Sequence, residues 1–346
     1  MAVNAGSDTI TVMRINDDMS LTVTDTIGSR GTGPNSLAYN DGIVYVTNID
    51  ADGEFGGEPD QEGSIYGYTF NDGDLETIPG SLRQLNNRPS AVRFSPDGST
   101  LLVTSINAGS NQLASADQDS IVSFTLDENG FPSEGIVSGA TSTLQGNAEN
   151  RNLPSAIGFE VVDRPDGGTY AVVTEAREFT AAGDPPNFPG LQSGSVSVYQ
   201  VGGDGSLTGS QLDLVAGQSA TRGEGQLTSC WIVFSPDGEY FYVSNAIDAT
   251  ISSFRFTDGS GNIELIQEVA AVGTGAGGNI TDGAAAFGVT DGWIDLDISD
   301  DGAYIYQLFG LSGAVGVYAV DNGNLTLVEV VSGNLPDNNT QGIVSF

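Results

Sequence analysis

The side chain best placed for chemistry is the carboxylate of Glu175. It ends the apolar run Tyr170-Ala171-Val172-Val173-Thr174-Glu175, and Arg177 follows two residues later. A partly buried carboxyl group can act as a general acid or base, and a nearby guanidinium can hold an anionic substrate or favour the ionised carboxylate. We therefore predict that Glu175 and Arg177 are catalytic, with Glu178 as the spare carboxylate. The competing interpretation is that Glu175 is a structural ion-pair partner at the rim of a sheet.

Arginine supplies every strong cation of the chain, since the ten residues counted as Lys and Arg are all arginine. Four of them fall in segments that lead into a predicted first strand and form the candidate substrate-binding set: Arg30, Arg88, Arg151 and Arg222. A local group of guanidinium side chains attracts a small carboxylate or phosphate and binds it in bidentate fashion. The alternative is that each arginine pairs with a nearby acid, as Glu149 is placed to do with Arg151 and Glu224 with Arg222.

The composition excludes several chemistries. With no histidine and one cysteine, Cys230, the chain cannot form a Ser-His-Asp triad, a zinc site or an internal disulfide. A formal net charge of −35 opposes binding to nucleic acid or an anionic membrane. We expect no cofactor, because no glycine-rich phosphate loop stands between a strand and a helix. We also expect no metal, although Asp295 and Asp297 share one strand face and could line a channel or bind a cation.

Five Asp-Gly turns recur along the chain and give the elements that carry these side chains. They are Asn40-Asp41-Gly42, Pro96-Asp97-Gly98, Pro165-Asp166-Gly167, Pro236-Asp237-Gly238 and Asp300-Asp301-Gly302. Each is flanked by short β-branched and aromatic runs, which is typical of a hairpin. In the clearest copy the predicted strands are 229–234, 240–245, 250–256 and 263–269, and no segment has a helical period. Repeated four-stranded units predict an all-β fold, a β-propeller of four-stranded antiparallel blades.

The two ends of the chain predict how the propeller closes. The N-terminal unit, with strands 2–4, 9–15 and 21–27, lacks a first strand, and residues 341–346 read as a first strand without partners. Pairing of the C-terminal strand with the N-terminal blade would close the ring and give six blades in one domain, residues 1–346. The turns within hairpins are short, whereas the other connections are long. Long connections on one face usually build a site there, although they can also accumulate where nothing forbids them.

Several runs resemble the lactonase family of β-propellers. They are 2–10 (Ala2 to Ile10), Ile43-Val44-Tyr45-Val46-Thr47-Asn48, Phe94-Ser95-Pro96-Asp97-Gly98, and the stretch from Ser229-Cys230-Trp231 to Tyr242-Val243-Ser244-Asn245. The family includes 6-phosphogluconolactonases, carboxymuconate cyclases and exported members, and its propellers usually have seven blades. The cyclase branch uses a histidine with arginine and glutamate. Because this chain has no histidine, the resemblance carries over only to Glu175 and the arginines, by their place in the repeat.

Two functions follow as hypotheses. The first is a lactone hydrolase or cycloisomerase acting on a small lactone or carboxylate at the long-loop face of the central channel. The second is a noncatalytic binding propeller, exported or at a cell surface, that uses the same face. In both cases the expected partner is a small anionic molecule or lactone. We expect a monomeric protein in an extracellular or periplasmic location.

Overall fold

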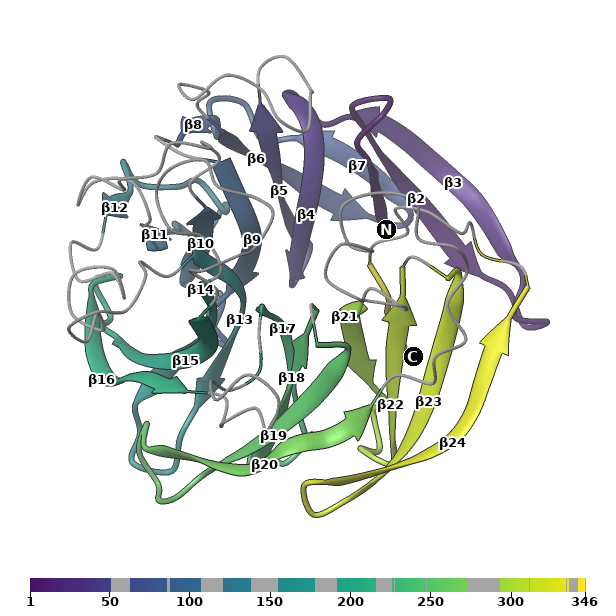
Figure 1. Ribbon diagram of the computed structural model, residues 1–346. Coiled ribbons are helices and arrows are strands. Elements are labelled where there is room, and N and C mark those ends of the chain that lie inside the picture. The colour runs from purple at the N-terminus through teal and green to yellow at the C-terminus, as the bar shows by residue number, and fades with distance from the viewer. Residues whose placement is uncertain are drawn as a thin grey trace, which may run out of the picture. The chain divides into compact units, whose positions relative to one another are not determined.

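The computed structural model describes most of the chain (Figure 1). The described residues are 1–50, 63–85, 88–106, 121–137, 155–177, 192–215, 226, 228–246, 248–272, 293–310, 312–333, 335 and 342–345. Over these ranges the secondary structure is entirely strand, bridge and turn, as predicted. The search for helices that could cross a membrane returned none among these residues.

The strands form antiparallel sheets in chain order. The first sheet holds β1 (Ala2–Asn4), β2 (Thr9–Ile15) and β3 (Leu21–Gly28). The second holds β4 (Thr32–Asn40), β5 (Ile43–Asp50), β6 (Ser64–Asn71) and β7 (Asp74–Thr77), with β8 (Arg83–Gln84) paired to β6. The third holds β9 (Arg88–Phe94), β10 (Thr100–Ile106), β11 (Ile121–Thr125) and β12 (Ile136–Val137).

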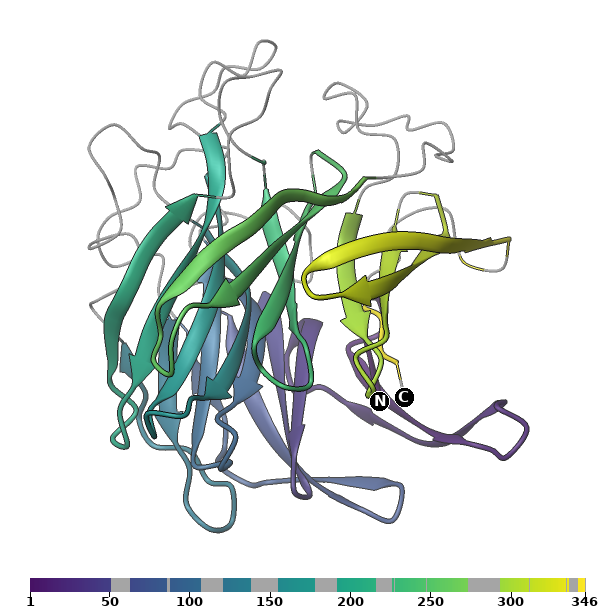
Figure 2. The same cartoon turned by 90° about the horizontal axis from the view of Figure 1, so that it is seen from below.

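Three further sheets, each of four strands, complete the described structure. The fourth holds β13 (Ser155–Asp163), β14 (Thr169–Arg177), β15 (Gln192–Val201) and β16 (Leu207–Val215). The fifth holds β17 (Ser229–Phe234), β18 (Tyr240–Asn245), β19 (Thr250–Phe256) and β20 (Ile263–Val272). The sixth holds β21 (Trp293–Ile298), β22 (Tyr304–Phe309), β23 (Ala314–Asp321) and β24 (Asn324–Ser332). Figure 2 shows the twist of these last strands.

This architecture is a six-bladed β-propeller, which confirms the predicted fold class. The chain divides into two compact units. Unit 1 comprises residues 1–144, 181–184 and 201–208, and unit 2 comprises 145–180, 185–200 and 209–346. The grouping of residues 1–346 into one domain stays a prediction.

The predicted closing strand differs from what the structure shows. Residues 342–345 are assigned to no strand, and the sheet of β1 has three strands. Side-chain carboxylates of β21 hold this segment instead: Asp295 Oδ2 accepts from Ile343 N at 3.3 Å, and Asp297 Oδ2 accepts from Ser345 N at 2.5 Å. Because these bonds go to side chains, the segment does not extend a β-ladder. The strand face shared by Asp295 and Asp297 therefore accepts hydrogen bonds from the main chain of residues 343 and 345.

A hydroxyl group fixes the bulge of the first strand in four sheets. Thr174 Oγ1 accepts from Gly158 N at 3.0 Å, where the β13–β14 register shifts between Ala156 and Phe159. In the same way, Thr104 Oγ1 accepts from Ala91 N and Ser244 Oγ accepts from Trp231 N. In the second sheet the hydroxyl is the donor: Thr47 Oγ1 donates to Ser36 O. A bulge leaves backbone groups without ladder partners, and the hydroxyl satisfies one of them. The recurrent Val-Thr or Val-Ser pair of the second strands is thus explained by the bulge beside it.

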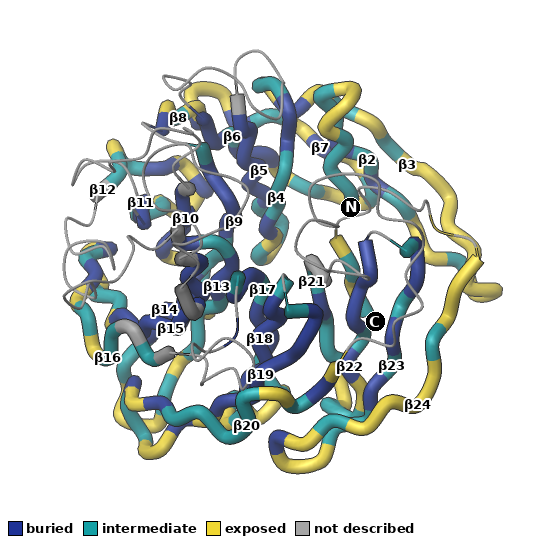
Figure 3. Tube along the Cα trace, in the orientation of Figure 1, coloured by how far each residue is buried: buried dark blue, intermediate teal, exposed yellow. Residues whose placement is uncertain are grey.

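The core lies between neighbouring sheets of each unit. In unit 2, Val172 of β14 and Val198 of β15 pack with Ile232 of β17 and Phe254 of β19. Figure 3 shows β17–β19 as mostly buried and β24 as mostly exposed. Trp231 is partly buried and packs against a second cluster in the same unit. The inner strands therefore combine a packed apolar core with buried polar side chains such as Ser244 and Ser252.

The Asp-Gly turns are built by hydrogen bonds to the aspartate. Asp97 Oδ1 accepts from Ser95 Oγ at 2.6 Å and from Ser99 N at 3.0 Å, and the following Gly98 has a φ of 72°. Asp237 is bonded in the same way by Ser235 Oγ. These side-chain donors lower the pKa of Asp97 and of Asp237 below the ordinary value. The turns predicted from the sequence are thus determined by hydrogen bonds between residues of the turn itself.

Candidate functional site

Glu175 lies near the end of β14 in unit 2, opposite Ala156 of β13. Its side chain has an exposed fraction of 0%, although glutamate is rarely fully buried in proteins. Its carboxylate Oε2 accepts a hydrogen bond from Ser195 Oγ on β15 at 2.7 Å. The structure thus supplies a hydrogen-bonded carboxylate–hydroxyl pair between two central strands. The alternative role of Glu175 as a structural ion-pair partner stays a prediction, beside this buried hydrogen bond.

The position of Glu175 recurs in other sheets, where an asparagine occupies it. Asn48 follows Val-Thr at this position in β5, Asn245 follows Val-Ser in β18, and Glu175 follows Val-Thr in β14. Asn245 Nδ2 donates to Thr250 Oγ1 at 3.2 Å, and Asn48 Nδ2 donates to Ser64 Oγ at 3.5 Å. Each amide ties the end of the second strand to the start of the third. We call this place the strand-end position; Glu175 is the carboxylate found there.

A second set of polar side chains surrounds the start of β17. Gln226 is almost fully buried: its Oε1 accepts from Thr250 Oγ1 at 2.6 Å and its Nε2 donates to Glu268 Oε1 at 3.0 Å. Its main-chain oxygen accepts from Gly194 N at 2.9 Å. Because Gly194 directly precedes Ser195, this set is continuous with the Glu175 pair. Sequence reasoning missed Ser195 and Gln226, since a lone serine and a loop glutamine carry no chemical signature.

The predicted arginines are distributed over several parts of the chain. Arg30 lies in unit 1, exposed and with a φ of 65°, in the segment between β3 and β4. Arg88 begins β9, also in unit 1, and is half-buried. Arg177 ends β14, where its backbone is described but its side chain is not. Arg151, Arg222 and Glu178 lie outside the described residues, as do most of the long connections. A contact of these arginines with Glu175 therefore stays a prediction.

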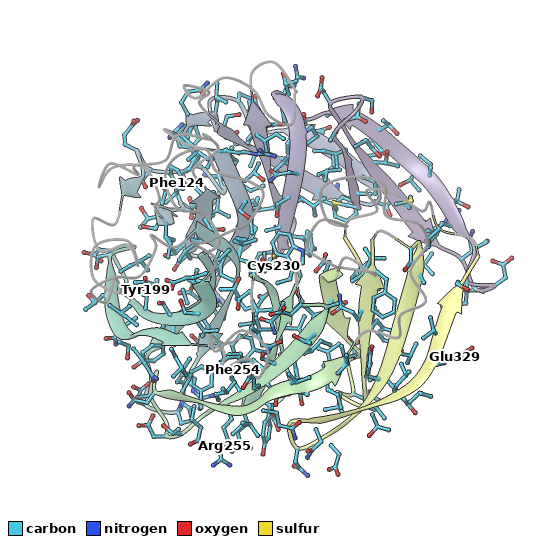
Figure 4. The ribbon with its side chains drawn as sticks, in the orientation of Figure 1. Phe124, Tyr199, Cys230, Phe254, Arg255 and Glu329 are labelled. Carbon is cyan, nitrogen blue, oxygen red and sulfur yellow. The ribbon has the colours of Figure 1, made fainter. Side chains whose placement is uncertain are left out.

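Other arginines have clear structural roles. Arg83 donates to the main-chain oxygens of Ser133 and Gly80, at 2.8 and 3.0 Å. Arg164 donates to Gly238 O at 2.7 Å and stacks over the Phe256 ring at 3.8 Å. Figure 4 shows Arg255 pointing away from its sheet, and it pairs there with Glu264. These three were not among the predicted binding residues, and their contacts explain them without a ligand.

Metal ligation finds no support among the described side chains. Among the described residues, no three His, Cys, Asp or Glu side chains lie close enough together to hold a metal ion. The thiol of Cys230, on β17, is buried (Figure 4). The main-chain oxygen of Cys230 accepts from Thr174 Oγ1. At the strand-end position, the Glu175 carboxylate, which accepts a hydrogen bond from Ser195, is a group that can transfer a proton.

Comparison with known proteins identifies a family over part of the chain. Residues 188–336, less than half of the sequence, match the family described as Lactonase, 7-bladed beta-propeller. The predicted resemblance to the lactonase family is thereby confirmed for that region. The description names seven blades, whereas the described residues of this chain form six sheets. A comparison with curated proteins found no match.

Solved structures share the fold across nearly the whole chain. The periplasmic gluconolactonase PpgL of Pseudomonas aeruginosa is 18% identical with a TM-score of 0.64, covering 95% of this chain and 81% of its own. A provisionally assigned 6-phosphogluconolactonase of Bacteroides uniformis is 17% identical with a TM-score of 0.60, covering 95% and 80%. A hypothetical selenium-binding protein of Sulfolobus tokodaii is 12% identical with a TM-score of 0.58, covering 92% and 72%. Such identities establish a common fold, which hosts several functions.

Proposed function

We propose that this protein hydrolyses or isomerises a small lactone or its carboxylate at the end of β14, on the face that carries the long connections. The family match over residues 188–336 and the neighbours named gluconolactonase and 6-phosphogluconolactonase support this reaction class. The proposed substrate-binding residues are Arg30, Arg88, Arg151 and Arg222, with Glu175 and Arg177 at the reacting bond. The partner is a small anionic molecule or lactone, and the protein acts as a monomer.

Hydrolysis requires water and lactone to reach the Glu175 carboxylate, which is fully buried in the described structure. Glu175 then takes a proton from the water molecule while the oxygen of that water bonds to the acyl carbon of the lactone. The ring C–O bond then breaks, and the ring oxygen leaves as a hydroxyl group after receiving that proton. The product is a hydroxy acid, which ionises and releases one proton to solvent. General acid–base catalysis of this kind typically contributes roughly 10²–10⁴-fold to the rate. An arginine at the new carboxylate binds it through two parallel hydrogen bonds.

One observation carries the proposal: β14 has a carboxylate at the strand-end position, where β5 and β18 have the amide of an asparagine. Asn48 and Asn245 show that asparagine at the strand-end position joins two strands in the same way. A buried carboxylate is the more costly choice, because removing its charge from water is unfavourable. Two other sheets thus form the same junction without a charged group. Groups that are costly for stability at such positions are typical of functional sites.

The test replaces Glu175 by the residue that other blades use. Glu175→Asn and Glu175→Gln are expected to fold and to lose turnover by at least about 100-fold, as removal of a general base does. The assay follows proton release from gluconolactone, 6-phosphogluconolactone and γ-butyrolactone in weak buffer, against the rate without enzyme. The control is Glu329→Gln on exposed β24, which belongs to a different sheet from Glu175 (Figure 4). It removes the same charge and is expected to keep full activity. Turnover by the Glu175 variants at the parent rate refutes the proposal.

A second function is favoured by one observation, the full burial of Glu175. A carboxylate with no exposed surface that replaces an asparagine can serve the fold alone. The protein would then be a noncatalytic binding propeller, exported or at a cell surface. It would turn over none of the three lactones, and calorimetry would show saturable gluconate binding that Arg88→Ala or Arg151→Ala removes. Turnover and binding thus separate the two functions.

The location proposed for the protein is extracellular or periplasmic. Its support is the neighbour from Pseudomonas aeruginosa, which is named as periplasmic. Acidic side chains that exceed basic ones by 35 keep such a protein soluble outside the cell. Fractionation of cells that express the native gene, followed by immunoblotting, would test this location.

A further inference from the structure

We propose that Ser195 is the positioning residue of Glu175 and that it commits this carboxylate to the role of base. This inference rests on the proposed function, in which Glu175 takes a proton from water. It is carried by the direction of one hydrogen bond and by the rigid support of the serine that donates it.

The direction of the bond at the strand-end position is reversed in β14. In β5 and β18 the asparagine amide donates to a hydroxyl, so Ser64 and Thr250 act as acceptors. At Glu175 the hydroxyl of Ser195 is the donor and the carboxylate Oε2 is the acceptor, at 2.7 Å. A donated hydrogen bond stabilises the ionised carboxylate, which is the form that takes up a proton. Ser195 therefore prepares Glu175 to accept a proton.

The main chain beside Ser195 is held on two sides. Gly194 N donates to Gln226 O at 2.9 Å. A Cβ atom at Gly194 would lie 2.8 Å from both Cβ and N of Ser229, a distance that real Cβ atoms do not show. The backbone of β15 thus rests directly against the start of β17, and only glycine permits this approach. The main-chain position from which the Ser195 side chain extends is consequently fixed.

The support of Gly194 extends to the outer strand of the next sheet. Gln226, which accepts from Gly194, is itself held by Thr250 of β19 and Glu268 of β20. Both Ser195 and Gln226 are buried, with exposed fractions of 0% and 4%. A loop residue bonded to three different strands is a stable anchor, because its movement would break every one of these bonds. The position of Ser195 is therefore determined by two sheets of unit 2.

The experiment measures kcat, KM and the pH–rate profile of Ser195→Ala and Ser195→Thr with the lactone that the parent protein turns over fastest. Ser195→Ala is expected to lower kcat about tenfold, the usual effect of losing a hydrogen bond to a charged group, and to leave KM within about twofold. The acid limb of the pH–rate profile is expected to move to higher pH, because the ionised carboxylate has lost one hydrogen-bond donor. Ser195→Thr restores both. The matched control is Ser197→Ala, a buried serine two residues along β15.

The outcomes separate this inference from the proposed function. An unmoved pH profile in Ser195→Ala, or equal losses of activity in Ser195→Ala and Ser197→Ala, overturns the positioning role while Glu175→Gln stays inactive. Full activity in Glu175→Gln overturns the proposed function itself. If Ser195→Ala fails to fold, Ser195→Cys keeps the test, because a thiol is a weaker donor of similar size and must give an intermediate shift of the profile.

Discussion

Replacing Thr174 by valine removes one hydroxyl from the bulge of β13 and keeps the shape of the side chain. In the structure this hydroxyl accepts from Gly158 N at 3.0 Å and lies against Gly158 O and Cys230 O. Thr174 has an exposed fraction of 0%, and valine fills the same volume as threonine, so its methyl group leaves no space for a water molecule to replace the lost partner. An unsatisfied buried donor costs about 1–3 kcal/mol. We therefore expect Thr174→Val to lower the free energy of unfolding by about 2 kcal/mol.

Urea unfolding followed by tryptophan fluorescence measures this loss. With a slope of about 3 kcal/mol per molar, the midpoint should fall by about 0.7 M at an unchanged slope. The control is Thr326→Val on β24, an exposed position where the change should stay within about 0.5 kcal/mol. Equal midpoints for the two variants would refute the claim that the hydroxyl holds the bulge, because only Thr174 has buried backbone partners.

Three other predictions follow from the described contacts. Gly158→Ala would place a Cβ atom 2.9 Å from the backbone of Trp231, so the urea midpoint should fall by the equivalent of about 1–3 kcal/mol, whereas Gly203→Ala, with nothing within 4 Å, should not change it. The hydrogen bond from the Ser260 hydroxyl is the main cause that lowers the pKa of Asp258 to about 2. The ionised Asp258 therefore stabilises the fold above about pH 4, and this contribution is lost as the pH falls toward 2. In Asp258→Asn the urea midpoint should consequently decrease less between about pH 4 and about pH 2 than in the parent protein. Asp297→Ala should free Ser345 and raise the hydrogen exchange of its amide, with the same substitution at exposed Asp72 as control.

Much of the fold could be predicted from the sequence because its signals are local. The strands 229–234, 240–245 and 250–256 were placed at their observed bounds, since Asp-Gly turns and β-branched runs define them within a few residues. The predicted pairing of residues 341–346 with the first sheet is not seen among the described residues. That prediction was based on the symmetry of the repeat. The structure shows instead that the carboxylates of Asp295 and Asp297 accept hydrogen bonds from Ile343 N and Ser345 N, and a strand pattern does not predict such side-chain contacts.

Less of the candidate site could be predicted. The sequence identified Glu175 by its type and its place at a strand end, and the structure shows that carboxylate buried and hydrogen-bonded. It did not identify Ser195 or Gln226, because their partners come from strands that are distant in sequence and depend on how two sheets pack. The Val-Thr-Glu run could have been compared with Val-Thr-Asn and Val-Ser-Asn of β5 and β18, which share its position. That comparison was the available signal for the structural role of Glu175.

The strand-end position has a consequence for how such a protein acquires new activities. A repeated architecture offers several copies of one polar socket, and the asparagines of β5 and β18 keep their own sheets joined whatever stands in β14. One copy can therefore exchange an amide for an acid while the others go on holding the molecule together. In a repeated architecture, some copies of a position can thus maintain stability while another copy accepts a reactive side chain. A single-sheet protein, with only one such socket, has no spare copy with which to try the same change.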